Sequence, residues 1–146
     1  MTKTVRAILL IVSGTCLPSD SSSQDFGRLD TGFEIFVTKR AEFPPGFEAE
    51  LVTTETYPCI GYVIRSGVSW RIDTLTIHIG GFVRPSPCVS SMSLATGTTY
   101  LGNIGEGMYI FRINYRGQRD LHRVSITSNG VIVEAIENSF TNIEWE

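Results

Sequence analysis

Four arginines near the C-terminal end have the types and spacing that most suggest chemistry: Arg112, Arg116, Arg119 and Arg123. Two precede and two follow Gly117-Gln118, which we interpret as the two residues of a hairpin turn. In that register Arg112 lies opposite Arg123, and Arg116 lies opposite Arg119. A guanidinium fork suits carboxylate, sulfate and phosphate groups. The spacing therefore predicts a surface that recognises an acidic polysaccharide or an acidic protein.

The same arginines have a second interpretation, as a solvated face. Like charges directly opposite one another destabilise a sheet, so an acidic neighbour is needed to offset them. Glu134 on the next strand and Glu106 nearby are candidates, although surface ion pairs contribute little to stability. The sequence leaves both interpretations open.

Catalytic motifs are missing from the sequence. It has no Gly-x-Ser-x-Gly elbow, no His-Glu-x-x-His, no phosphate loop and no dinucleotide fingerprint. We predict that His122 lies beside the core opposite Ile113 as a packing residue, and His78 ends a strand without an acid beside it. None of the 15 acidic residues forms a pair singled out by its spacing. We expect no enzyme and no cofactor, with a small hydrolase as an alternative.

Aromatic side chains on the surface would indicate stacking against sugars. The candidates are Trp70, Tyr100 and Trp145. Trp70 alternates with Val68 and Ile72, which places it in the predicted core.

Three cysteines bear on the compartment of the protein: Cys16, Cys59 and Cys88. The last two each follow a proline in a turn, and we predict a Cys59–Cys88 disulfide, worth about 3–4 kcal/mol for a loop of roughly 30 residues. The alternatives are three reduced, buried thiols or a bridge that uses Cys16. With no Cys-x-x-Cys pair and two histidines, we expect no metal site. A disulfide favours an extracytoplasmic location, whether periplasmic, cell-surface or secreted.

Composition narrows the fold and the partners. The chain of 146 residues has a net charge of −3, which argues against nucleic acid as a partner. Thr, Ile and Val supply 41 residues and Ala and Leu only 14, an excess typical of all-β proteins. No apolar run is long enough for a transmembrane helix. We expect residues 1–146 to form one β-sandwich domain, with a long loop at 14–31 and a tail at 138–146.

Turn residues divide the chain into nine predicted strands. In Val68–Ile79 the apolar positions change parity, which predicts a bulge near Asp73-Thr74 or a strand that changes sheets. The tail Asn138–Glu146 is expected to dock as an edge strand or to project toward a partner. The predicted strands are Thr4–Ser13, Gly32–Arg40, Glu48–Thr54, Ile60–Ser66, Val68–Ile79, Ser91–Ala95, Met108–Tyr115, Asp120–Ser128 and Val131–Glu137.

The N-terminal segment admits two interpretations. Lys3 and Arg6 precede the apolar run Ala7–Val12, which is shorter than the hydrophobic region of a secretory signal. We therefore predict a first strand of the mature domain, with an export signal absent or trimmed. Because the run is apolar on both faces, the strand is either buried in its own domain or donated to a neighbouring subunit. The second case would make the protein a self-assembling oligomer or filament subunit.

The final hairpin resembles a known family. Gly107–Gly117 reads G-M-Y-I-F-R-I-N-Y-R-G, and Asp120–Thr127 reads D-L-H-R-V-S-I-T. This pattern, over about a third of the chain, resembles the closing hairpin of bacterial immunoglobulin-like sandwiches. The resemblance implies a Greek-key sandwich and a surface or periplasmic setting, and it transfers no functional residue.

One apolar surface is expected to join the last three strands. In the predicted registers, its members are Tyr109, Phe111, Ile113, Val124 and Val133. The guanidinium groups then face water. The combined expectation is a non-catalytic, extracytoplasmic binding or structural module.

Overall fold

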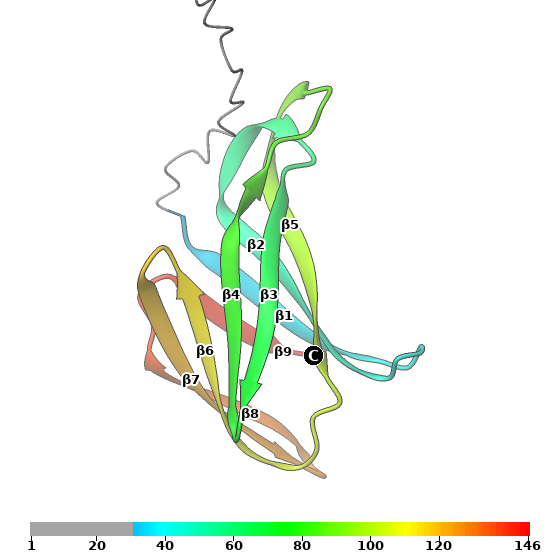
Figure 1. Ribbon diagram of the computed structural model, residues 1–146, viewed down its shortest axis with the longest axis vertical. Helices are drawn as coiled ribbons and strands as arrows, with labels where there is room; N and C mark the ends of the chain where they lie inside the picture. The colour runs from blue at the N-terminus through cyan, green and yellow to red at the C-terminus, as the bar shows by residue number, and fades with distance from the viewer. Residues whose placement is uncertain (1–30) are drawn as a thin grey trace, which may run out of the picture.

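The computed structural model describes residues 31–146, and the regular structure in this part is entirely β-strand (Figure 1). The all-β prediction is confirmed. The predicted strand Thr4–Ser13, Cys16 and residues 14–30 of the predicted loop lie outside the described residues. The strands are β1 (Phe33–Arg40), β2 (Gly46–Ile60), β3 (Val63–Arg71), β4 (Thr74–Val83), β5 (Val89–Gly102), β6 (Gly107–Tyr115), β7 (Gln118–Thr127), β8 (Gly130–Glu137) and β9 (Thr141–Trp145).

All nine strands belong to one mixed sheet in the order β8-β7-β6-β4-β3-β5-β2-β1-β9. The sheet curls into a nearly closed barrel, with β8 and β9 as its two edges (Figure 1). Most neighbours are antiparallel, but β1 with β9, β4 with β6 and β3 with β5 run parallel. The tail therefore docks as an edge strand, one of its two predicted placements.

The core lies inside this curl, because each strand turns alternate side chains inward. The predicted apolar surface of the last three strands is confirmed. Phe111, Ile113 and Val124 are fully buried, and Tyr109 and Val133 are partly buried against them.

The predicted register of the last hairpin is wrong by two residues. The turn consists of Arg116 and Gly117, with φ of 50° and 77°, and Tyr115 pairs with Gln118. A positive φ at both central residues is the type I′ pattern, which glycine accommodates at its second position. A shift of two residues leaves every side chain on its predicted face. It removes the predicted opposition of arginines, because Arg112 now lies opposite Leu121.

The predicted strand Val68–Ile79 is two strands. Strand β3 ends at Arg71 and β4 begins at Thr74, so a two-residue turn at Ile72-Asp73 causes the change of parity. The bulge lies elsewhere, between Arg65 and Ser66. Trp70 is 42% exposed because it stands at the end of the barrel beside this turn, so its predicted place in the core is wrong.

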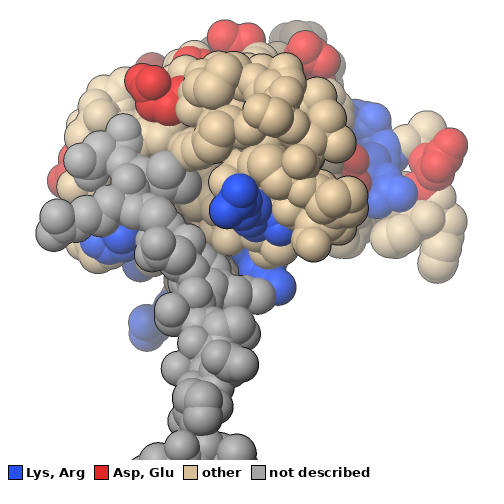
Figure 2. All heavy atoms as spheres, turned by 90° about the horizontal axis from the view of Figure 1, so that it is seen from above, with Lys and Arg blue, Asp and Glu red and all other residues tan. Residues whose placement is uncertain are grey.

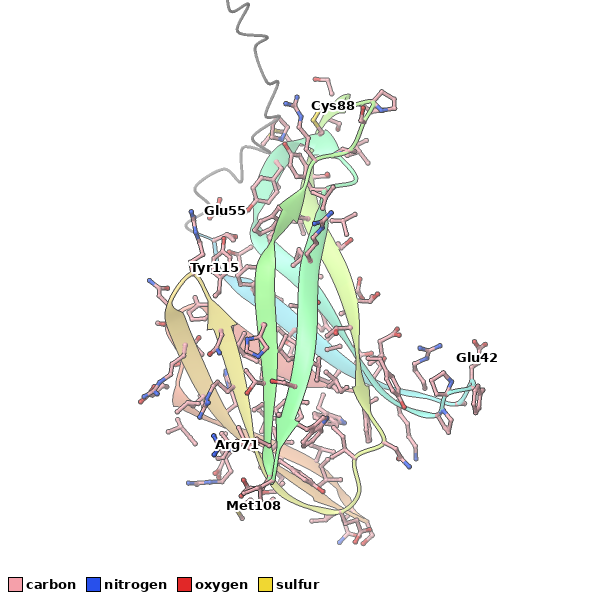
Figure 3. The ribbon with its side chains drawn as sticks, viewed as in Figure 1. Glu42, Glu55, Arg71, Cys88, Met108 and Tyr115 are labelled. Atoms are coloured by element: carbon pink, nitrogen blue, oxygen red, sulfur yellow. A yellow bond between two sulfur atoms is a disulfide. The ribbon has the colours of Figure 1, made fainter. Side chains whose placement is uncertain are left out.

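Two features constrain the barrel away from the β3–β4 turn, one at the opposite end and one in the middle. Cys59 and Cys88 form the predicted disulfide, with Cα atoms 5.3 Å apart, at the end opposite Met108 (Figure 3). Where β3 crosses β5, the backbone of Ile64 lies against Gly97, and a Cβ atom there would collide with the Ile64 carbonyl oxygen. Residues 31–146 contain no helix that is long and apolar enough to cross a membrane.

Candidate functional site

The start of β9 lies against β7, and we call this contact the seam. Among residues 31–146, the one buried acidic side chain, Asp120, lies in it. Asp120 is fully buried and accepts five hydrogen bonds of 2.7–2.9 Å from the backbone and hydroxyl groups of Ser139 and Thr141 and the amide of Phe140. Burial by itself raises the pKa of the Asp120 carboxyl, but the hydrogen bonds from Phe140, Ser139 and Thr141 outweigh it and lower the pKa below its ordinary value. Asp120 thus holds the start of β9 against β7.

His122 extends this network without forming a nucleophile. The hydroxyl of Thr141 donates to Asp120 and accepts from Nε2 of His122 at 2.9 Å. Burial lowers the pKa of the imidazole, against the pull of the Asp120 carboxylate, which raises it. Because the Thr141 hydroxyl has one proton and donates it to Asp120, His122 donates to Thr141 and does not take its proton, the reverse of a base activating a hydroxyl. The residue is buried opposite Phe111, not Ile113, as a packing histidine.

The four predicted arginines all lie on the outer surface of the β6–β7 hairpin, and we call their side chains the arginine face. Two of them pair with glutamates of β8. Arg123 lies 3.3 Å from Glu134, and Arg119 lies 3.4 Å from Glu137. These side chains are about half exposed, so the pairs contribute little to stability. The predicted partner Glu134 is correct for Arg123.

The other two arginines have no carboxylate partner among the described residues. Arg112 is half-buried between Thr76 and Leu121, and its Nε is buried without a hydrogen-bond partner in the described part of the chain. Arg116 lies over the ring of Tyr115, 5.9 Å from its centroid. Neither guanidinium group therefore has a counter-charge within residues 31–146.

A shallow groove beside the hairpin brings part of the arginine face together with residues of β4. It has a volume of about 400 Å³, and we call it the outer groove. Arg116 and Arg119 line it together with His78 and Asn114, while Arg112 stands two residues along β6 from Asn114. His78 is also 3.0 Å from the hydroxyl of Ser69. The sequence did not predict that His78 and Asn114 lie beside the arginines, because the parallel pairing of β4 with β6 carries no local sequence signal.

Charge is unevenly distributed over the barrel. The outward side chains of β1, β2 and β9 include four glutamates, whereas the arginine face lies on β6 and β7. In Figure 2 most acidic side chains lie along the upper edge of the view. Most basic side chains lie in its middle and lower parts, apart from one basic group at the right. The glutamates are Glu34, Glu48, Glu50 and Glu144.

A larger pocket of about 680 Å³ opens at the end of the barrel where β7 and β8 separate from β9. We call it the end pocket. We call its buried and half-buried apolar lining the floor, which includes Phe47, Ile126 and Trp145. We call its exposed or partly exposed polar lining the rim, which includes Lys39 and Glu106. The size falls within the range of small-molecule sites in proteins.

The three aromatic residues considered for sugar stacking have different environments. Trp145 lines the end pocket. Tyr100 donates to the carbonyl of Pro45, and the indole of Trp70 donates to the carbonyl of Leu101. The sequence held one signal for the end pocket. The inward-facing side chains of β1 are apolar until the last of them, Lys39, which is charged.

Comparison with known proteins gives no match: no family model, no curated protein and no solved structure is similar to the chain. Function is therefore inferred from the geometry of these surfaces.

Proposed function

We propose that the protein is a non-catalytic binding module that takes an anionic ligand on its arginine face. The supporting observation is that Arg112 and Arg116 have no carboxylate partner among the described residues, while Arg119 and Arg123 do. An anion in the outer groove supplies a counter-charge to Arg116, which lines it, and Arg112 lies two residues along β6 from Asn114.

The outer groove offers donors of several geometries to such an anion. Arg116 and Arg119 contribute guanidinium groups, Asn114 an amide and His78 an imidazole. A sulfate or carboxylate accepts several such bonds at once, and bonds to charged groups are the stronger ones. Because the groove is shallow, the ligand we favour is a chain that lies along the surface, such as an acidic polysaccharide.

The proposed setting is extracytoplasmic. The Cys59–Cys88 disulfide supports it, since such bridges persist in oxidising compartments. The finer assignment to an immunoglobulin-like Greek-key sandwich is part of the same proposal and rests on the pattern of the β6–β7 hairpin alone.

Heparin, a sulfated polysaccharide, is the probe that tests this proposal. Arg116→Gln, at an arginine that lines the outer groove, should weaken binding about tenfold, the equivalent of one charged hydrogen bond. Arg84→Gln is the matched control, because Arg84 is exposed on the loop after β4 and its substitution removes the same charge. Glu134→Gln should strengthen binding by releasing Arg123. Equal weakening by both arginine variants would mean that heparin senses only net charge, and the proposal would fail.

Self-association is the second candidate, and the separated charges favour it. The acidic side of one copy complements the arginine face of another, and such a front-to-back contact propagates into a filament. Sedimentation at low and high salt tests it, with Glu50→Arg expected to abolish any salt-sensitive oligomer. Donation of the N-terminal strand, the route predicted from sequence, involves residues outside the described part.

A further inference from the structure

We infer that the end pocket binds a neutral sugar unit, stacked on Trp145. The pocket lies away from the outer groove, shares no lining residue with it, and does not depend on the arginine face.

Trp145 is a firmly held platform. Its ring packs against Phe47 at 5.0 Å and Phe111 at 5.7 Å between centroids, and both of these neighbours are buried. The backbone of Trp145 pairs with Val37 of β1. Trp145 itself is only half-buried and lines the pocket. A rigid aromatic surface of this kind offers contact area at little cost in side-chain entropy.

The indole N–H of Trp145 adds a donor to this platform, since it has no hydrogen-bond partner among the described residues. That of Trp70, in contrast, is bonded to the Leu101 carbonyl. A tryptophan N–H group normally has a partner when it is buried, and the hydroxyl of a ligand that covers Trp145 would provide one.

The rim of the end pocket mixes donors and acceptors. Lys39 donates, Glu106 accepts and Asn103 does both, and Lys39 and Glu106 form no ion pair within residues 31–146. Arg40, the other basic residue of the rim, is occupied by Glu48 at 3.1 Å. Sugar hydroxyls are both donors and acceptors, so they can satisfy each of these groups.

Other ligand classes fit this lining less well. An acyl chain would bury the charged rim without pairing it, which is costly. A strongly anionic ligand would meet Glu106 and Glu146, and a cation would meet Lys39 and Arg40. A ring with one apolar face and a hydroxyl edge matches both the aromatic floor and the mixed rim.

The test titrates the full chain with neutral oligosaccharides of glucose, mannose, xylose and N-acetylglucosamine. The chain has two tryptophans, so ¹H–¹⁵N spectra contain two indole signals, which Trp70→Phe assigns. We expect at least one sugar to shift the Trp145 signal and leave that of Trp70 in place.

Rim variants decide whether binding uses the end pocket. Glu106→Gln and Lys39→Gln should each weaken binding about tenfold, the value of a hydrogen bond to a charged group. Glu134→Gln is the control, because it makes the same chemical change on β8 at a residue that does not line the pocket, and it should leave affinity unchanged. The inference fails if no neutral sugar shifts the Trp145 signal, if the rim variants bind like the unaltered chain, or if only acidic sugars bind.

Discussion

Replacing Asp120 with Asn tests whether the buried carboxylate closes the barrel. The side chain of Asp120 accepts five hydrogen bonds from three consecutive residues that lead into β9. Asparagine keeps the shape but replaces one oxygen with an NH₂ group and removes the charge. The variant should fold and be less stable.

The size of the loss follows from the two oxygens of Asp120. Oδ2 accepts three bonds from Phe140 and Thr141, and Oδ1 accepts two from Ser139. The best orientation of Asn keeps its oxygen at the Oδ2 position, so the NH₂ group replaces Oδ1. The Ser139 hydroxyl can turn to accept from this NH₂ group, but the bond from the Ser139 amide is lost. The remaining bonds lose their charge assistance. Together these losses amount to about 3 kcal/mol, or a Tm about 10 °C lower for a chain of this size.

Acid titration of stability distinguishes lost charge from lost shape. Because the folded pKa of Asp120 lies below its ordinary value of 3.8, its contribution is complete above about pH 4 and disappears as pH falls through the folded pKa. The difference in unfolding free energy between the unaltered chain and Asp120→Asn should therefore be full at pH 7 and shrink below about pH 4. Other carboxylates cancel in this difference.

Guanidinium unfolding across this pH range is the assay. Asp73→Asn is the control, since Asp73 is exposed and its side chain bonds only to its neighbour Thr74. A loss from Asp120→Asn no larger than that of the control, or a loss that stays constant down to pH 2, would refute the charged network as the closure of the seam.

Three further changes probe other parts of the fold. Alanine at both Cys59 and Cys88 should lower the unfolding free energy by about 3–4 kcal/mol, and an unchanged denaturation midpoint would contradict a closed bridge. Gly97→Ala should destabilise by several kcal/mol or prevent folding because of the Ile64 carbonyl, whereas Gly67→Ala, where no atom lies within 4 Å of the added Cβ, should be close to neutral in thermal melts. Because burial lowers the pKa of His122 despite the opposing pull of the Asp120 carboxylate, stability should decline as pH falls below about 6.5, where the unfolded state takes up the proton first; His122→Gln should flatten that limb of the curve.

The inward and outward faces of the last hairpin could be predicted from the sequence because alternation is local information. Phe111, Ile113 and Val124 are buried as their spacing predicts. The exact pairing depends on one residue of the turn, Arg116, which adopts φ of 50° although nothing in its type demands it. A two-residue error in register thus left the faces correct and the opposition of charges wrong.

The arginines could be predicted from the sequence, but the residues that complete the two binding surfaces could not, because each surface joins strands distant along the chain. His78 meets the arginine face through the parallel pairing of β4 with β6. Trp145 meets Phe47 because β9 pairs with β1, more than 100 residues earlier. The shared Pro-Cys context did predict the disulfide, although Cys59 lies within β2 and not in the predicted turn.

Ile72 shows most sharply why the β3–β4 turn was missed, and it supplies a test. Ile72 is the first of the two turn residues and has φ of 57°, whereas Asp73 has no positive φ. In hairpin turns with this pattern, glycine normally occupies the first position. A β-branched residue there costs about 1–2 kcal/mol, and the side chain is 95% exposed, so its removal forfeits no burial. After the entropy that glycine adds to the unfolded chain, Ile72→Gly should gain about 1 kcal/mol, or a rise in Tm of about 3 °C. Ile72→Val keeps the branching and should gain nothing. A lower Tm for Ile72→Gly would show that the isoleucine side chain makes a contribution that outweighs the strain.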